Sequence, residues 1–124
     1  MELNPEKDLE IDVTNLTSEF KSFPIVMFRY SQQRAKVEAQ RDVAKAFLKE
    51  TRAIVYKRVK SDVSAKHTQI SLEAEIDTDP VVIEAQKKLI RAEHDASTWA
   101  GAVESMRSKK DVLIQLGSDR RKEM

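Results

Sequence analysis

The sequence contains no cysteine, only two glycines and three prolines, and only seven aromatic side chains in 124 residues. Without cysteine there is no disulfide framework and no thiolate chemistry, a composition that fits a reducing compartment. The scarcity of glycine and proline leaves few turn signals for a sheet protein, and the common residues are ones that favour helix. We therefore expect an all-α protein located in the cytoplasm.

Membrane and export signals are also missing. The amino terminus lacks the basic and then apolar pattern of a secretory signal, and the longest apolar run, Pro24 to Phe28, is far too short to cross a bilayer. We expect a soluble protein that makes no membrane contact.

Motifs for common enzyme chemistry are absent as well. The only glycines, Gly101 and Gly117, cannot form a phosphate-cradling loop, so ATP hydrolysis and dinucleotide binding are not expected. His67 and His94 lie in different predicted elements with no second imidazole or thiol at ligand spacing. The sequence predicts no enzyme activity, no metal and no cofactor.

The net charge of +1 conceals a strong segregation of charge along the chain. Between Ile25 and Lys60 there are ten basic and three acidic side chains, whereas residues 1–23 and 71–98 are both acidic. This alternation favours oppositely charged segments, or neighbouring subunits, meeting in register.

The pattern divides the chain at Pro24, Ser61, Pro80 and Gly117. Pro24 should end a short helix and begin the next one, Asp79 followed by Pro80 is a strong helix start, and Gly117 should end the last helix. The first residues, 1–11, should form an extended arm that can dock on a neighbour. The predicted segments are an acidic arm with a short helix at 1–23, a long basic helix at 24–60, an acidic connector with a short helix at 61–79, a carboxy-terminal oligomerisation helix at 80–117, and a tail at 118–124.

The long basic helix is the candidate binding surface. Its cations gather on one side and an apolar arc lies opposite, and Tyr56 sets a ring among the cations. Single-stranded nucleic acid uses this mixture, because cations neutralise phosphates and rings stack on bases. The alternative is a solvated face balanced by acids elsewhere. The candidate DNA-binding residues are Arg41, Lys45, Lys49, Arg52, Tyr56, Lys57, Arg58 and Lys60.

A heptad of apolar residues runs along the helix from Pro80 to Leu116. Two long amphipathic helices forming a hairpin would leave much of each apolar stripe in water, which favours pairing with further copies. Gly101, inside this helix, suggests a close helix approach. The residues expected at the oligomer interface are Val82, Leu89, Trp99, Val103, Met106 and Leu113.

Four short motifs in a fixed order resemble the UvsY family of phage recombination mediator proteins. They are Asp12 to Leu16 (DVTNL), Met27 to Ser31 (MFRYS), Glu38 to Gln40 (EAQ) and, most specifically, Gly101 to Lys109 (GAVESMRSK). Length and element order agree from Ile11 to Leu116.

The resemblance implies a non-enzymatic, cyclic homo-oligomer in the host cell cytoplasm. Such a protein binds single-stranded DNA non-specifically, helps displace the single-strand-binding protein and loads a RecA-like recombinase. The family's DNA-binding basic pair maps onto Tyr56 and Arg58, and only Arg58 matches directly. Two alternatives are a helical structural, scaffolding or chaperone-like oligomer without DNA binding, and an architectural protein of double-stranded DNA.

Overall fold

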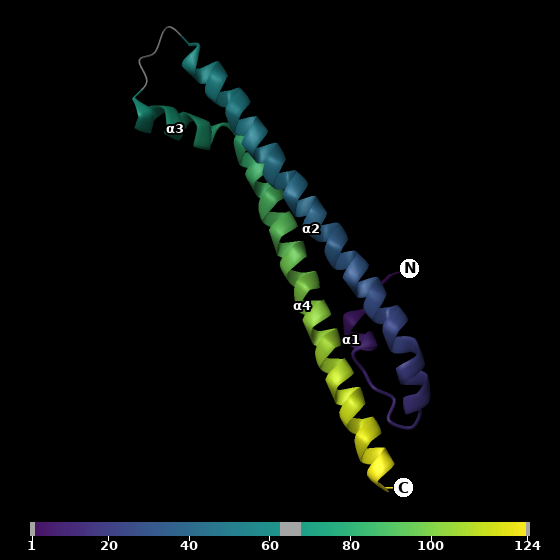
Figure 1. The fold of residues 1–124 in the computed structure, drawn as a ribbon. Helices are drawn as coiled ribbons and strands as arrows, with labels where there is room; N and C mark the ends of the chain where they lie inside the picture. Colours follow the sequence, from purple (N-terminus) through teal and green to yellow (C-terminus); the bar gives the residue numbers. More distant parts are fainter. Residues whose placement is uncertain (1, 63–67, 124) are drawn as a thin grey trace. The chain divides into compact units, whose positions relative to one another are not determined.

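The computed structural model describes residues 2–62 and 68–123, and every regular element in this part of the chain is helical (Figure 1). The elements are α1 (Pro5–Asp8), α2 (Leu16–Lys60), α3 (Gln69–Thr78) and α4 (Pro80–Glu123). Residues 63–67 of the predicted connector lie outside the described residues. The all-α prediction is confirmed, and one long helix packs against the other.

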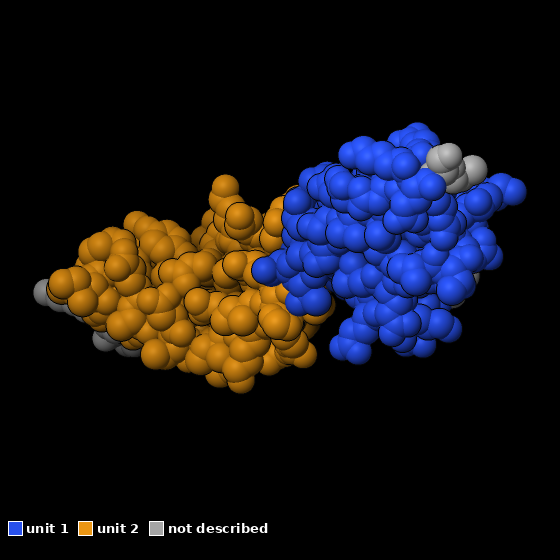
Figure 2. All heavy atoms as spheres, turned by 90° about the horizontal axis from the view of Figure 1, so that it is seen from below, with its two compact units in different colours: residues 1–36, 96–124 blue, residues 37–95 orange. Residues whose placement is uncertain are grey.

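The chain divides into two compact units (Figure 2). Unit 1 comprises Met1–Lys36 and Ala96–Met124, and unit 2 comprises Val37–Asp95. Each unit therefore contains one part of α2 and one part of α4, and each has its own core.

The helix α2 begins earlier than predicted and passes through Pro24, so the prediction of two helices separated at this proline was wrong. The side chain of Asn15 accepts a hydrogen bond from the backbone N–H of Ser18 at 3.2 Å, which caps the new start. Proline inside a helix costs about 3 kcal/mol because it cannot donate to the carbonyl four residues before. Packing of Phe23 and Met27 against the unit 1 core offsets that cost.

The unit 1 core holds buried side chains from α2 and α4, with residues of the amino-terminal arm packed on it. The ring centroids of Tyr30 and Trp99 lie 6.0 Å apart at an interplanar angle of 46°. The arm contributes Leu3 and Leu9, so it packs on its own chain, and its residues Pro5–Asp8 are helical rather than extended. The buried core residues are Tyr30, Ala102, Val103 and Met106.

Polar contacts also fasten the arm. The Tyr30 hydroxyl donates to Asp8 Oδ2 at 2.6 Å, and Lys109 Nζ donates to the backbone carbonyl oxygens of Asp8 and Glu10 at 2.6 and 3.0 Å. Lys109 Nζ also lies 3.1 Å from Glu19 Oε2, with only 9% and 16% of the two side chains exposed. The other carboxylate oxygen of Glu19 accepts from the Asp12 N–H at 3.0 Å. The arm is thus attached to both long helices.

Unit 2 is closed by α3, whose Leu72 and Ile76 are buried against residues of α2 and α4. Thr68 caps the start of α3 by accepting from the Ser71 N–H at 3.1 Å. Asp79 ends α3, and its Oδ1 accepts from the Val81 N–H at 2.9 Å, so α4 begins at Pro80 as the sequence indicates. The remaining members of this core are Val55, Val59 and Val82, with Leu48 packed against them.

The helix α4 continues past Gly117 to Glu123, so the predicted end at Gly117 and the separate tail were wrong. Gly117 has no positive φ and is an ordinary helical residue. A Cβ atom there would lie 3.2 Å from Cζ of Phe20, so this glycine permits a close approach of that ring. Gly101, which was expected to mark a close approach, has nothing within 4 Å of the position of a Cβ atom.

Candidate nucleic-acid interface

All eight candidate DNA-binding residues lie on α2 within unit 2. The side of α2 that carries Val55 and Val59 is buried. At 100° per residue, one flank of this buried side carries a row of cations with one aromatic ring. This row, called the cation stripe below, consists of Arg41, Lys45, Lys49, Arg52, Tyr56 and Lys60.

The centre of the cation stripe has uncompensated charge. Lys45 and Lys49 are exposed, and neither makes an ion pair or a hydrogen bond with the part of the chain that the structure describes. They are one helical turn apart, a spacing of about 6 Å, so both face the same side of the helix. Both ammonium groups are therefore free to meet an anion.

Tyr56 and Lys60 form a contact at the carboxy-terminal end of the cation stripe. Lys60 Nζ lies 3.0 Å from the Tyr56 hydroxyl oxygen and 5.3 Å from the centroid of its ring. The hydrogen bond to that hydroxyl raises the pKa of Lys60 above its ordinary value. Tyr56 is 36% exposed as a residue, with the Lys60 ammonium group over its ring.

The arginines differ from these lysines because each is ion-paired within the chain. Arg52 Nη1 lies 2.7 Å from Oδ1 of Asp77 in α3, and Arg41 Nη2 lies 3.2 Å from Oδ1 of its neighbour Asp42. Arg52 and Arg41 are therefore partly neutralised members of the cation stripe.

Arg58 lies on the other flank of α2 and pairs with Asp79, the residue that caps α4. The hydrogen bond from the Val81 N–H, with Arg58 contributing, lowers the pKa of Asp79 below its ordinary value. The Arg58 guanidinium therefore supports the α3–α4 junction. Lys57 is exposed and lies outside the cation stripe, on the side of α2 opposite to the buried side.

One contact near this surface was not predicted. Lys88 of α4 lies with its Nζ 5.6 Å from the ring centroid of Phe47, a cation–π distance. The pair is on the flank of α2 that does not carry the cation stripe. The two residues are far apart in sequence, and no local pattern joins them.

Four of the six residues expected at the oligomer interface are buried within the chain itself, and a fifth, Trp99, packs against a core. Val82 belongs to the unit 2 core, Val103 and Met106 belong to the unit 1 core, and Leu113 is also buried. Trp99 and Leu89 are half-buried, and Trp99 packs on the unit 1 core. The α4 heptad is therefore used for packing inside the protomer and, in this conformation, four of its residues are closed to a second copy.

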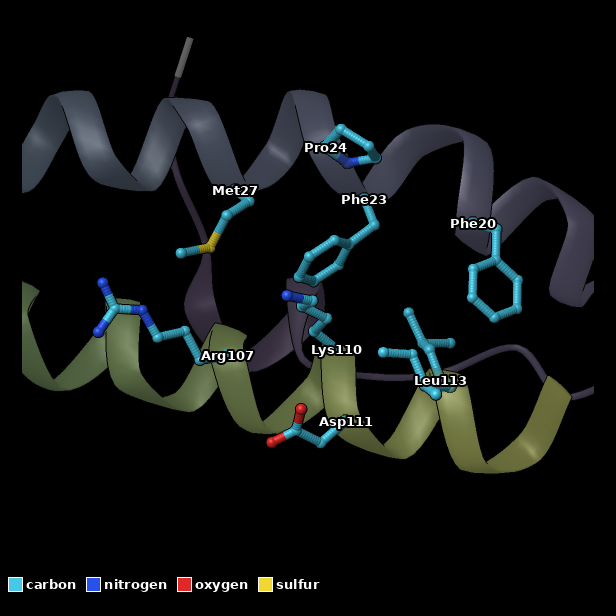
Figure 3. A pocket seen from close by; sticks show the side chains of 9 residues that line it. Phe20, Phe23, Pro24, Met27, Arg107, Lys110, Asp111 and Leu113 are labelled. Atoms are coloured by element: carbon cyan, nitrogen blue, oxygen red, sulfur yellow. The ribbon is translucent and has the colours of Figure 1, made fainter. Parts of the chain in front are cut away.

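An open groove lies in unit 1, where α2 and α4 face each other (Figure 3). Its volume is about 680 Å³. The lining has no serine or histidine. The lining residues are Phe20, Phe23, Pro24 and Met27 from α2, and Arg107, Lys110, Asp111, Leu113 and Ile114 from α4.

No cluster of three or more histidine or carboxylate side chains that could hold a metal ion occurs among residues 2–62 and 68–123. His67 lies outside these described residues. Within the same ranges, no helix is both long and apolar enough to pass through a bilayer. No protein-family profile, curated protein or solved structure matches the chain in the comparisons with known proteins.

Proposed function

We propose that this protein is a recombination mediator: a ring-forming homo-oligomer that binds single-stranded DNA without sequence preference. The observation that carries the proposal is a pair of exposed lysines, Lys45 and Lys49, which have no ion-pair partner among the described residues and lie in one row with the partly exposed Tyr56. Cations that follow phosphates and a ring that can stack on any base together give sequence-tolerant binding. Lys60 extends the same row, while Arg52 and Arg41 add charge that intramolecular carboxylates reduce.

The oligomer is supported by apolar side chains that the protomer leaves exposed. Val43, Phe47 and Ile54 form a stripe on α2 in unit 2, with 71%, 46% and 61% exposed. A second stripe on α4 contains Ile83 and Ile90, with 37% and 61% exposed. Burying such side chains stabilises an association by about 1.5 to 3 kcal/mol each at most, which is enough to drive assembly when several are covered together.

The two stripes lie on opposite sides of the unit. Phe47 is on the flank that contacts Lys88, whereas helical spacing places Ile83 and Ile90 on the other flank of α4. Two different surfaces that bind each other form a head-to-tail contact, which closes into a ring when the rotation allows it. A ring repeats the cation stripe, so weak contacts act at high effective concentration.

In the cell, by the resemblance to the UvsY family, the ring replaces single-strand-binding protein with a RecA-like recombinase in the host cytoplasm. This activity needs no nucleotide hydrolysis by the mediator itself. The functional test is the DNA-dependent ATPase of a RecA-like recombinase on strands coated with single-strand-binding protein. Addition of this protein should shorten the lag before hydrolysis begins, and an unchanged lag would remove the mediator assignment.

DNA binding is tested by fluorescence anisotropy with an oligo-dT strand over a range of salt. The double substitution Lys45→Gln and Lys49→Gln should weaken binding and reduce the slope of log affinity against log salt by about 1.4, or about 0.7 per lost phosphate contact. Lys87→Gln is the control, because this exposed lysine is on the outer side of α4. Equal slopes for the double variant and the wild type would refute the cation stripe as the binding surface.

A scaffolding or chaperone-like oligomer is the second candidate, and the exposed apolar stripes on α2 and α4 favour it equally. It predicts assembly without DNA affinity. Mass photometry of wild type and of Ile54→Glu, with and without oligo-dT, separates the two functions. The mediator requires a large assembly that gains the mass of the strand, whereas the scaffold requires the same assembly with no gain.

A further inference from the structure

The helix α3 places a carboxylate directly in the cation stripe. Asp77 Oδ1 lies 2.7 Å from Nη1 of Arg52, and Arg52 sits between Lys49 and Tyr56 on the same flank of α2. If a DNA strand placed one phosphate on Lys49 and stacked a base on Tyr56, its backbone would approach this guanidinium. Asp77 thus occupies the position that a phosphate oxygen of a bound strand would take.

We propose that Asp77 is a built-in competitor of single-stranded DNA, which holds Arg52 in the free protein and is displaced by a phosphate when a strand binds. The inference rests on the proposed function and concerns the regulation of the same surface. Guanidinium groups bind carboxylate and phosphate with the same planar set of donors, so one ligand can replace the other.

The exchange requires movement of side chains only. About 59% of the Asp77 side chain and 39% of the Arg52 side chain are exposed, so both reach solvent and both can change rotamer. The helix α3 itself is fixed by its buried residues Leu72 and Ile76. Opening the ion pair therefore leaves the unit 2 core intact, and the cost is that of a surface ion pair.

The second ion pair of this region has a different role. Arg58 pairs with Asp79, of which only 10% of the side chain is exposed and which also caps α4. Releasing that aspartate would remove a helix cap as well as a charge. The competitor is therefore Asp77 alone, and the experiment leaves Asp79 unchanged.

The test measures affinity for oligo-dT by fluorescence anisotropy at low salt in a double-mutant cycle of Arg52 and Asp77. Asp77→Asn should tighten binding by about two- to fivefold, the equivalent of one surface ion pair. It should also steepen the salt dependence by about 0.7, because Arg52 now neutralises a phosphate. In the Arg52→Gln background the same change at Asp77 should have no effect.

Glu84→Gln is the matched control, because it also removes one negative charge from an exposed ion pair of unit 2. Glu84 Oε1 lies 3.6 Å from Nη2 of Arg91, and this pair is outside the cation stripe. Asp77→Ala is a second variant with a stronger helix former, and it should give the same gain. The inference is overturned if Asp77→Asn gains no more than Glu84→Gln, or if the gain persists without Arg52. Absence of binding by every variant and the wild type would instead refute the proposed function.

Discussion

Lys109 should be the largest single contributor to the stability of unit 1 among the charged residues described. Its side chain is 9% exposed, and its ammonium group serves three acceptors: the carbonyl oxygens of Asp8 and Glu10 and the carboxylate of Glu19. The substitution Lys109→Met keeps the apolar stem and removes the charge. The Glu19 carboxylate, itself only 16% exposed, then loses its counter-charge while it remains largely buried.

The expected loss of stability follows from the cost of leaving one member of a buried pair alone. Removing one partner of such a pair costs about 3 to 5 kcal/mol, and partial exposure of Glu19 places this case at about 3 kcal/mol. For a chain of this length that corresponds to a fall in Tm on the order of 10 °C. The arm should also loosen, because two of its carbonyl groups lose their donor.

Thermal denaturation followed by circular dichroism measures the effect, and hydrogen exchange of residues 4–12 reports the arm. Lys110→Met is the matched control, because the neighbouring lysine is exposed and has no ion pair among the described residues. The control should change Tm by only a degree or two. If the two variants have equal Tm values, Lys109 does not hold the arm against α2 and α4.

Three further substitutions test separate parts of the fold. Gly101→Ala should stabilise the protein by about 1 kcal/mol in urea denaturation, because a Cβ atom meets nothing within 4 Å and alanine is the better helix former. Pro24→Ala should raise the free energy of unfolding by about 2 kcal/mol in the same measurement, because the carbonyl of Phe20 regains an amide partner. Unchanged stability would mean that the helix is not strained at this proline. Burial, with the hydrogen bond to Asp8, raises the pKa of Tyr30 far above its ordinary value of 10.0. Above pH 10 the unfolded tyrosine loses a proton that the folded one keeps, so stability should fall by up to about 1.4 kcal/mol per pH unit, and Tyr30→Phe should lack this part of the fall.

The long helices could be predicted because they depend on local properties. Few breakers interrupt the chain, and both long helices carry apolar residues at helical spacing. The errors fell at Pro24 and Gly117, where the local rule was overridden by packing. Phe20 lies against Gly117, and these two residues are far apart in sequence. Their contact stabilises the part of α2 that precedes Pro24 and the part of α4 that follows Gly117.

The packing partner of the α4 heptad could not be predicted from the sequence pattern. A repeat of apolar residues shows that a helix has one side to bury, but the repeat is the same whether the partner is α2 of the same chain or another copy. The structure places Val103 and Met106 against Tyr30 of the same chain. The apolar residues left for another copy are weaker in pattern, such as Val43 and Ile54, and are recognised only once the protomer core is known.

Individual charge pairs could not be predicted either, although the charge segregation that produces them was visible. The acidic arm meets Lys109 of α4, and the acidic end of α3 meets Arg52 and Arg58. Both acidic segments therefore pair within the protomer, which is one of the two arrangements that the alternation allowed.

The consequence for function concerns where positive charge remains. Of the cations on α2 in unit 2, the arginines have carboxylates beside them, while Lys45 and Lys49 have none among the described residues. An anionic polymer gains most where charge is not already compensated, because each phosphate contact there releases counterions without breaking an ion pair. Binding should therefore begin at these two lysines, and Arg52 should contact the strand afterwards. In stopped-flow measurements with oligo-dT, Lys49→Gln should slow association, whereas Arg52→Gln should mainly speed dissociation. Equal effects of the two substitutions on the association rate would contradict this order.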